Sequence, residues 1–315
     1  MAKRSRTKAR DQQTTPGEVG PRQPCPCGSG RRYKACHGSP DGPPPVFVRR
    51  PFEGLASECD LVALRELVPA ATAPLTLRDG GDREVLLATL LPGAAPAYVG
   101  ADGRVVLALQ VLHGFGDPSR DLGAVLTDAL AYAEAGDSGT VGLTSDPGEG
   151  PRLQDLLVDG PLDITVHPTF GYWADVVDDE SGAVAAAAEQ ADAQMTPTRR
   201  LESVTAAYWT DVRTKEHLRW AMPQPEDELL DALARLHAAG ADEVAEGSRL
   251  VGMFRAHGLL TPVWDLPSGT GADVLEDAAT AFAARLDDAL AESTPLTTEQ
   301  RSVRSALAGR QVTIR

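Results

Sequence analysis

The sequence lacks most of the motifs that reveal an enzyme. Its 315 residues include only four cysteines and six histidines, and aromatic residues make up 5% of the composition. There is no G-x-x-x-x-G-K-[ST] phosphate loop, no H-E-x-x-H metalloprotease motif and no G-x-S-x-G nucleophile elbow. Gly269-Thr270-Gly271 lacks the third glycine of a dinucleotide-binding turn. The most easily recognised nucleotide-dependent and hydrolytic enzymes are therefore excluded.

Long apolar runs are also absent. No segment approaches the roughly 18 to 20 consecutive apolar residues that span a membrane, and no apolar run near the first residue has the form of a signal peptide. Cys59 has no cysteine partner outside the cluster discussed below, so a disulfide framework is not expected. The sequence therefore predicts a cytoplasmic protein without a membrane span.

The remaining composition is that of a folded protein with an uneven distribution of charge. Hydrophobic residues make up 42% and charged residues 24% of the chain, and its formal net charge is −15. Residues 1–50 contain eleven Lys and Arg residues against three acidic residues, a balance of +8, which leaves −23 on the remainder. We therefore expect the first fifty residues to attract polyanions and the body not to bind nucleic acid.

The one stretch with readable chemistry lies near the start of the sequence. Cys25, Cys27, Cys36 and His37 follow the spacing C-x-C-x8-C-H, which supplies the three sulfurs and one nitrogen of a closed tetrahedral zinc site. Glycines and a serine at positions 28–30 allow the tight turn that directs backbone amides towards the sulfurs. The sequence predicts one structural Zn²⁺ held by these four residues.

Two further features agree with a metal site. Three thiolates and a neutral imidazole leave one negative charge on the zinc centre, and Arg31, Arg32 and Lys34 lie within the loop to offset it. A module of this size cannot bury a core, so the metal must supply its folding free energy, about 10–16 kcal/mol in comparable zinc peptides. We therefore expect the module to be unfolded without zinc.

These residues resemble the SEC-C motif, known from the C-terminus of the SecA protein-translocation ATPase and found as an appendage on many bacterial proteins. The likeness extends to residues around the four ligands, namely Pro24, Pro26, Gly28, Ser29, Gly30, Tyr33, Lys34 and Gly38. In the translocase this element docks to the SecB chaperone and the ribosome, so the resemblance implies binding rather than catalysis. The whole chain resembles an actinobacterial family of unknown function with a SEC-C motif, and that likeness implies no activity.

Composition predicts five segments, since a run of proline, glycine and aspartate separates the cysteine cluster from the rest. They are a disordered basic arm at 1–22, a zinc-binding motif at 23–39, a proline-rich linker at 40–54, an α+β region at 55–178, and a helical region packed on it at 179–315. The zinc module is thus expected to fold apart from the body. The oligomeric state is not indicated.

Apolar periodicity predicts an α+β body with a mostly helical C-terminal half. Strands are expected at 75–77, 85–91, 105–112, 140–143, 162–167 and 170–173. Helices are expected at 55–67, 118–136, 183–194, 198–222, 225–240, 242–257, 272–291 and 297–309. Ser119 is the candidate N-cap of the second of these helices, and Thr297 with Gln300 forms a capping box at the last.

Three stretches of the body have residues that could carry chemistry, and each has a simpler explanation. His113 with Asp117 and Asp121 could present a general base after a strand, but a loop with helix-capping aspartates is the favoured interpretation. Residues 215–220 could form a binding surface or a half-exposed helix face. Residues 80–82 begin like the signature of cyclic-dinucleotide synthases, but Arg83 breaks that pattern and a hairpin turn explains it better.

Two hypotheses for the function remain. The first is a zinc-binding adaptor or interaction protein that binds a protein or the ribosome through residues 1–50, near nascent chains or the secretion machinery. The second is an enzyme of unknown reaction in the acidic body, with the zinc arm as a targeting module. A pocket lined by converging carboxylates or histidines would favour the enzyme, and a body with only a shallow surface would favour the adaptor.

Overall fold

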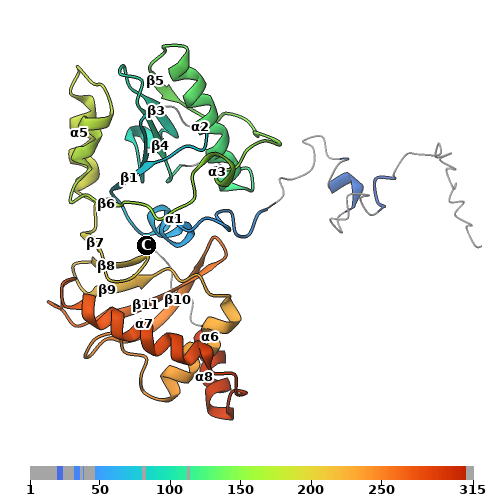
Figure 1. Ribbon diagram of the computed structural model, residues 1–315, viewed down its shortest axis with the longest axis vertical. Helices are drawn as coiled ribbons and strands as arrows, with labels where there is room; N and C mark the ends of the chain where they lie inside the picture. Colours follow the sequence, from blue (N-terminus) through green and yellow to red (C-terminus); the bar gives the residue numbers. More distant parts are fainter. Residues whose placement is uncertain are drawn as a thin grey trace, which may run out of the picture. The chain divides into compact units, whose positions relative to one another are not determined.

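The computed structural model describes residues 20–23, 32–35, 38, 47–79, 83–111 and 114–309. The chain divides into two compact units, Met1–Phe47 and Val48–Arg315. The described part of the first unit contains a 3₁₀ turn, η1 (Tyr33–Ala35). The second unit, called the body below, contains two β-sheets with helices around them (Figure 1).

The first sheet of the body is mixed and has the strand order β5-β3-β4-β2-β1-β6. Its strands are β1 (Ala71–Leu75), β2 (Val85–Ala88), β3 (Ala97–Val99), β4 (Val105–Ala108), β5 (Gly139–Val141) and β6 (Thr165–Val166). Only β2 and β4 pair in parallel, and the other neighbours are antiparallel. All four residues of β4 are buried, as expected for a strand that is covered on both faces.

Helices cover both faces of this sheet. Their bounds are α2 (Pro118–Glu134), α3 (Leu153–Leu156), η3 (Phe170–Tyr172), α4 (Trp173–Val176) and α5 (Ala183–Asp192), and a short η2 (Pro92–Ala94) precedes β3. Side chains of α2 pack on Val105 and Leu107, whereas η3, α4 and α5 pack on Val106 and Ala108. Successive residues of β4 thus contribute to different hydrophobic clusters because side chains alternate between the faces of a strand.

The second sheet is entirely antiparallel, with the strand order β10-β11-β9-β8-β7. Its strands are β7 (Thr198–Arg200), β8 (Ala207–Asp211), β9 (Glu216–Trp220), β10 (Arg249–Ala256) and β11 (Leu259–Leu266). Helices α6 (Glu226–Ala238) and α7 (Leu275–Ala291) pack against one face, and α8 (Thr298–Gly309) packs on α6. Trp264 and Phe282, whose ring centroids are 5.2 Å apart, join this face of the sheet to α7.

Helix α1 (Glu58–Glu66) lies between the two sheets (Figure 1). It contributes Leu61, Val62 and Leu64 to the same hydrophobic cluster as β4 of the first sheet and Tyr208 of the second. Residues 58–64 are all buried, which is the pattern of a helix that is covered on every side. Because α1 contacts both sheets, the segment that follows it, Leu67–Pro69, leads from the shared core to the first sheet.

The α+β fold class is confirmed, and the sheets occupy both halves of the body. In the C-terminal half, α5, α6, α7 and α8 fall where helices are predicted. The predicted helix at 198–222 is wrong, because this segment forms β7, β8 and β9. The predicted helix at 242–257 is also wrong, since its second half is β10. The predicted strand at 170–173 consists instead of η3 and the first residue of α4.

Among the residues that the structure describes, no helix is both long and apolar enough to cross a membrane. Residues 80–82 lie outside the described residues, so the hairpin predicted for them stays a prediction.

Candidate functional site

The predicted zinc ligands Cys25, Cys27, Cys36 and His37 lie outside the described residues. The segments that flank them are described and contact each other. The Tyr33 N–H donates to the carbonyl of Gln23 at 2.8 Å, and the Lys34 N–H donates to the carbonyl of Pro21 at 2.9 Å. These bonds join the described residues before Cys25 to the described residues before Cys36.

A glycine is needed at position 38 because the backbone there lies against Tyr33. Its N–H donates to the Tyr33 carbonyl at 2.8 Å, and a Cβ at position 38 would lie 2.6 Å from the Tyr33 ring. No side chain fits in that space without displacing the ring. The backbone therefore passes directly against Tyr33 immediately after Cys36 and His37, which gives Tyr33 and Gly38 a joint structural role.

The flanking geometry fits a zinc module. Three thiolates and an imidazole are the donor set of a closed Cys3His site, and Cys25, Cys27, Cys36 and His37 are the residues that would hold the ion. Across the described residues, no group of three or more His, Cys, Asp or Glu side chains is arranged to hold a metal. The basic side chains Arg22, Arg32 and Lys34 are exposed on the module.

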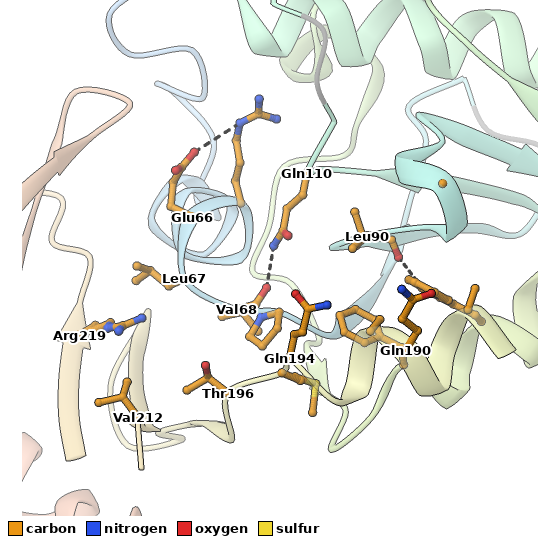
Figure 2. A pocket seen from close by; sticks show the side chains of 18 residues that line it. Glu66, Leu67, Val68, Leu90, Gln110, Gln190, Gln194, Thr196, Val212 and Arg219 are labelled. Atoms are coloured by element: carbon orange, nitrogen blue, oxygen red, sulfur yellow. Dashed lines mark hydrogen bonds and ion pairs between the residues drawn. The ribbon is translucent and has the colours of Figure 1, made fainter. Parts of the chain in front are cut away.

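The body contains a cavity of about 600 Å³ where the two sheets approach α1 and α5. Its lining comes from the end of α1 and the residues after it, from η3 and α4, from α5 and the segment after it, and from β9. In the view of Figure 2, Arg219 and Val212 lie on one side of this space, and Gln190 and Gln194 lie on the other. The cavity has a size typical of small-molecule sites.

Charged groups at the α1 end of the cavity are already paired. The Arg65 guanidinium donates to the Leu109 carbonyl and lies 3.6 Å from the Glu66 carboxylate. Glu66 Oε1 lies 2.7 Å from His257 Nε2, and this hydrogen bond from His257 lowers the pKa of Glu66. Burial lowers the pKa of Arg65. This end is therefore occupied by an internal network.

Arg219 is different. It is the fourth residue of β9, where it pairs in register with Tyr208 of β8 and Val263 of β11. Its side chain is half-buried and lines the cavity, and burial lowers its pKa. Within the described part of the chain, its guanidinium forms neither a hydrogen bond nor an ion pair. Buried charges in proteins are normally paired, so this arginine is an unusual feature of the cavity.

The rest of the lining combines aromatic and amide groups. Phe170 and Trp173 lie with ring centroids 4.8 Å apart, and the Trp173 indole N–H donates to the Leu90 carbonyl at 2.8 Å. Gln190 and Gln194 are one helical turn apart, and their amides form no hydrogen bond with other described residues. The described lining contains one carboxylate, Glu66, and no histidine, serine or cysteine.

The predicted group of His113, Asp117 and Asp121 has a structural explanation for its described members. Asp117 is the N-cap of α2, where it accepts from the Ser119 N–H at 3.2 Å. Ser119 was expected at this cap and is instead inside the helix. The Asp121 carboxylate accepts from the Phe115 N–H at 3.0 Å. His113 lies outside the described residues.

The charged stretch at 215–220 forms β9 and the residue before it, so the helical interpretation of this stretch is wrong. Its members have separate roles. Lys215 Nζ and His217 Nδ1 contact the Asp265 carboxylate at 2.7 and 3.0 Å, and Glu216 accepts from the Gly271 N–H at 2.8 Å. Arg219 lines the cavity. The sequence therefore singled out this stretch as a candidate binding surface. The strand geometry then shows that Arg219 lines the cavity and that Lys215, Glu216 and His217 do not.

The only cysteine in the described part of the chain, Cys59, is part of the hydrophobic core, as expected from its position in α1. Burial raises the pKa of its thiol to about 12, which keeps it protonated at neutral pH. A nucleophilic role at this position is therefore not supported.

Comparisons with known proteins identify two regions of the chain. Residues 22–39 match the SEC-C motif, a zinc-binding type of motif, and residues 51–315 match a family of unknown function, DUF5926. No curated protein and no solved structure matched the chain. Because the second match covers nearly all of the body and most of the chain, the protein belongs to the DUF5926 family of unknown function.

Proposed function

We propose that the protein is a zinc-binding adaptor whose N-terminal module docks on the ribosome, where it carries the body to nascent chains or to the secretion machinery. The match of residues 22–39 to a SEC-C motif supports this proposal most directly. Cys25, Cys27, Cys36 and His37 would hold the ion. Zinc supplies the folding free energy that a module without a core cannot provide.

The arrangement of charge in the described part of the module favours an anionic partner. Hydrogen bonds from Tyr33 to Gln23 and from Lys34 to Pro21 join the two basic segments of the module. The exposed Arg22 therefore belongs to the same compact element as the exposed Arg32 and Lys34. With −23 on residues 51–315 and +8 on residues 1–50, contact with ribosomal RNA is expected through the module and the basic residues before it.

An enzyme in the body was the alternative hypothesis. The one carboxylate in the described lining of the cavity, Glu66, is held by His257 and Arg65. No general acid, base or nucleophile stands free beside it, so no particular observation favours a reaction. The adaptor is therefore the function that we put forward.

Ribosome co-sedimentation tests the proposal. The full chain is compared with a variant that combines Arg22→Gln, Arg32→Gln and Lys34→Gln. A control variant combines Arg199→Gln, Arg213→Gln and Arg249→Gln, which removes the same charge from exposed positions of the body. Each phosphate contact contributes about one unit to the slope of log K against log salt concentration, so loss of three contacts should lower that slope by about three.

If the module docks on ribosomes, the full chain and the body control variant should pellet with ribosomes at 50 mM salt, and the module variant should pellet poorly. Chelation of zinc should cause a partial loss, because the basic residues before the module remain. Equal pelleting of the two triple variants, or no pelleting of the full chain, would exclude the ribosome as the partner. A protein captured by the intact module but not by the chelated module would then identify a protein partner instead.

A further inference from the structure

The cavity of the body has an unpaired cation in a fixed position. β9 is an interior strand of the second sheet, with β8 and β11 hydrogen-bonded on its two sides, so the backbone of Arg219 is held firmly. The side chain reaches into the cavity from that strand (Figure 2). An arginine that is half-buried without a partner is costly for the free protein, and fixed cations of this kind are typical of sites that receive an anion.

The neighbouring charges limit the ligand to one negative charge. Arg65 and Glu66 pair with each other at 3.6 Å, and Glu66 also pairs with His257. Their charges therefore compensate one another, and Arg219 is the one cation of the described lining that has no partner. A second negative charge on the ligand would share the cavity with the Glu66 carboxylate and find no further cation. A carboxylate matches a single guanidinium, and a dianionic phosphate does not.

The remaining walls indicate the rest of the ligand. Leu90, Ala191 and Met195 are half-buried and line the cavity, so their side chains are available for apolar contact, whereas Phe170 and Trp173 are only 4% and 3% exposed. The amides of Gln190 and Gln194 have no hydrogen-bonding partner among the described residues and can donate to and accept from a polar group. The far wall is thus suited to an aromatic or aliphatic group with one neutral polar substituent.

We propose that this cavity binds a small organic monocarboxylate, with Arg219 holding the carboxylate, the side chains of Leu90, Ala191 and Met195 contacting an apolar group, and Gln190 or Gln194 contacting an amide or carbonyl. The site is independent of the zinc module and of any ribosome contact. The body is acidic and repels anions in general. Only an anion that is stabilised by contact with Arg219 overcomes this repulsion, so the cavity also selects its anionic ligands. The body would then sense or carry a metabolite while the module docks.

A set of three matched probes tests this proposal on the full zinc-loaded chain by isothermal titration calorimetry. N-acetyl-L-phenylalanine has a carboxylate, an amide and an aromatic ring. Its primary amide is the same molecule without the charge, and phenyl phosphate carries a second negative charge. We expect the carboxylate to bind at least about tenfold more tightly than either of the other probes.

Two pairs of variants assign the binding to the cavity. Arg219→Gln should weaken the carboxylate at least about tenfold and leave the neutral amide unchanged, whereas Arg249→Gln, an exposed arginine of the same sheet, should change neither. Gln194→Glu should weaken the carboxylate through repulsion, whereas Ala193→Glu adds the same charge at an exposed position that does not line the cavity. This second pair tests the site even if Arg219→Gln fails to fold.

The results can overturn the proposal in several ways. Equal affinities for the carboxylate and its amide would show that Arg219 does not select a charge. Tighter binding of phenyl phosphate would exclude a monoanion site. Unchanged binding in both Arg219→Gln and Gln194→Glu would place the ligand elsewhere. A dissociation constant above about 10 mM for the carboxylate would exclude this ligand class. None of these outcomes depends on ribosome binding.

Discussion

Glu66 Oε1 lies 2.7 Å from His257 Nε2, although the two residues are 191 positions apart in the sequence. Glu66 is the last residue of α1, and His257 is in the turn between β10 and β11. The contact therefore joins the helix between the sheets to the second sheet. The Glu66 side chain also lines the cavity, as Arg219 does. One residue thus both holds the helix to the second sheet and forms part of the candidate site.

We predict that Glu66→Gln destabilises the body at neutral pH by about 1 kcal/mol, the scale of a partly exposed charged hydrogen bond. The hydrogen bond from His257 lowers the pKa of Glu66 below its ordinary value of 4.5. The ionised carboxylate thus contributes stability above that value, and this contribution is lost as the pH falls through the lower pKa of the folded state. Urea unfolding of wild type and variant at pH 7, 5 and 4 should therefore show a difference that shrinks with acidity.

Glu149→Gln provides the control for this measurement, since Glu149 is exposed and its carboxylate has no partner among the described residues. Its stability should match that of wild type at each pH. If Glu66→Gln showed the same destabilisation at pH 4 as at pH 7, the effect would come from packing, and the charged hydrogen bond would not be its cause.

Local features of the fold could be predicted from the sequence. The capping box at the start of α8 is confirmed, because the Thr297 N–H donates to Gln300 Oε1 at 2.9 Å and the Gln300 N–H donates to Thr297 Oγ1 at 3.2 Å. Gly240 follows α6 with φ of +67°, as its place at the end of that helix predicts. Both features depend on residues within one or two helical turns, and that proximity is why sequence alone finds them.

The second sheet was missed for a physical reason. Leu201, Tyr208 and Val212 recur at spacings that suit a helix, yet Ala207 and Tyr208 are both buried, against different clusters on opposite faces of the sheet. A strand that is covered on both faces has no clean alternation of polar and apolar residues, so the period of two is obscured. The cavity could not be predicted for the same reason. Arg219 and the residues of α5 line one space only because the second sheet brings these distant parts of the sequence together.

The zinc site gives a second prediction. One zinc should bind per chain through Cys25, Cys27, Cys36 and His37, and Cys27→Ser combined with Cys36→Ser should abolish it. Cys59→Ala is the matched control, since Cys59 is buried in the core of the body and should not affect the zinc content. Elemental analysis of protein purified under reducing conditions measures the zinc content of the wild type, the double variant and the control. Substoichiometric metal in wild type, or an unchanged zinc content in the double variant, would contradict the assignment.

A third prediction concerns Gly38. Because a Cβ at this position would lie 2.6 Å from the Tyr33 ring, Gly38→Ala must shift the residues that follow Cys36 and His37. We expect zinc affinity to fall by about tenfold to a hundredfold, the range found when groups that support metal ligands are disturbed. Competition with a chelator measures the affinity. Gly20→Ala is the control, since its Cβ would make only ordinary contacts with Gln23 at 3.5 Å, and equal effects of both changes would refute a role specific to Gly38.

The last prediction is that the body folds without the module. The division between the two units falls after Phe47, and the first residues of the body are already fixed: the Val48 N–H donates to the Gly116 carbonyl at 2.7 Å, and the Arg50 guanidinium donates to the Glu58 carboxylate at 2.6 and 2.8 Å. A chain of residues 46–315 should therefore retain the midpoint of thermal unfolding of the body, and limited proteolysis should cut between Ser39 and Val48. Arg50→Gln within this chain should lower its stability by about 1 to 3 kcal/mol, because it leaves the buried Glu58 without its charged partner. Loss of cooperative unfolding in the 46–315 chain would show that the module contributes to the core and that the two units do not fold separately.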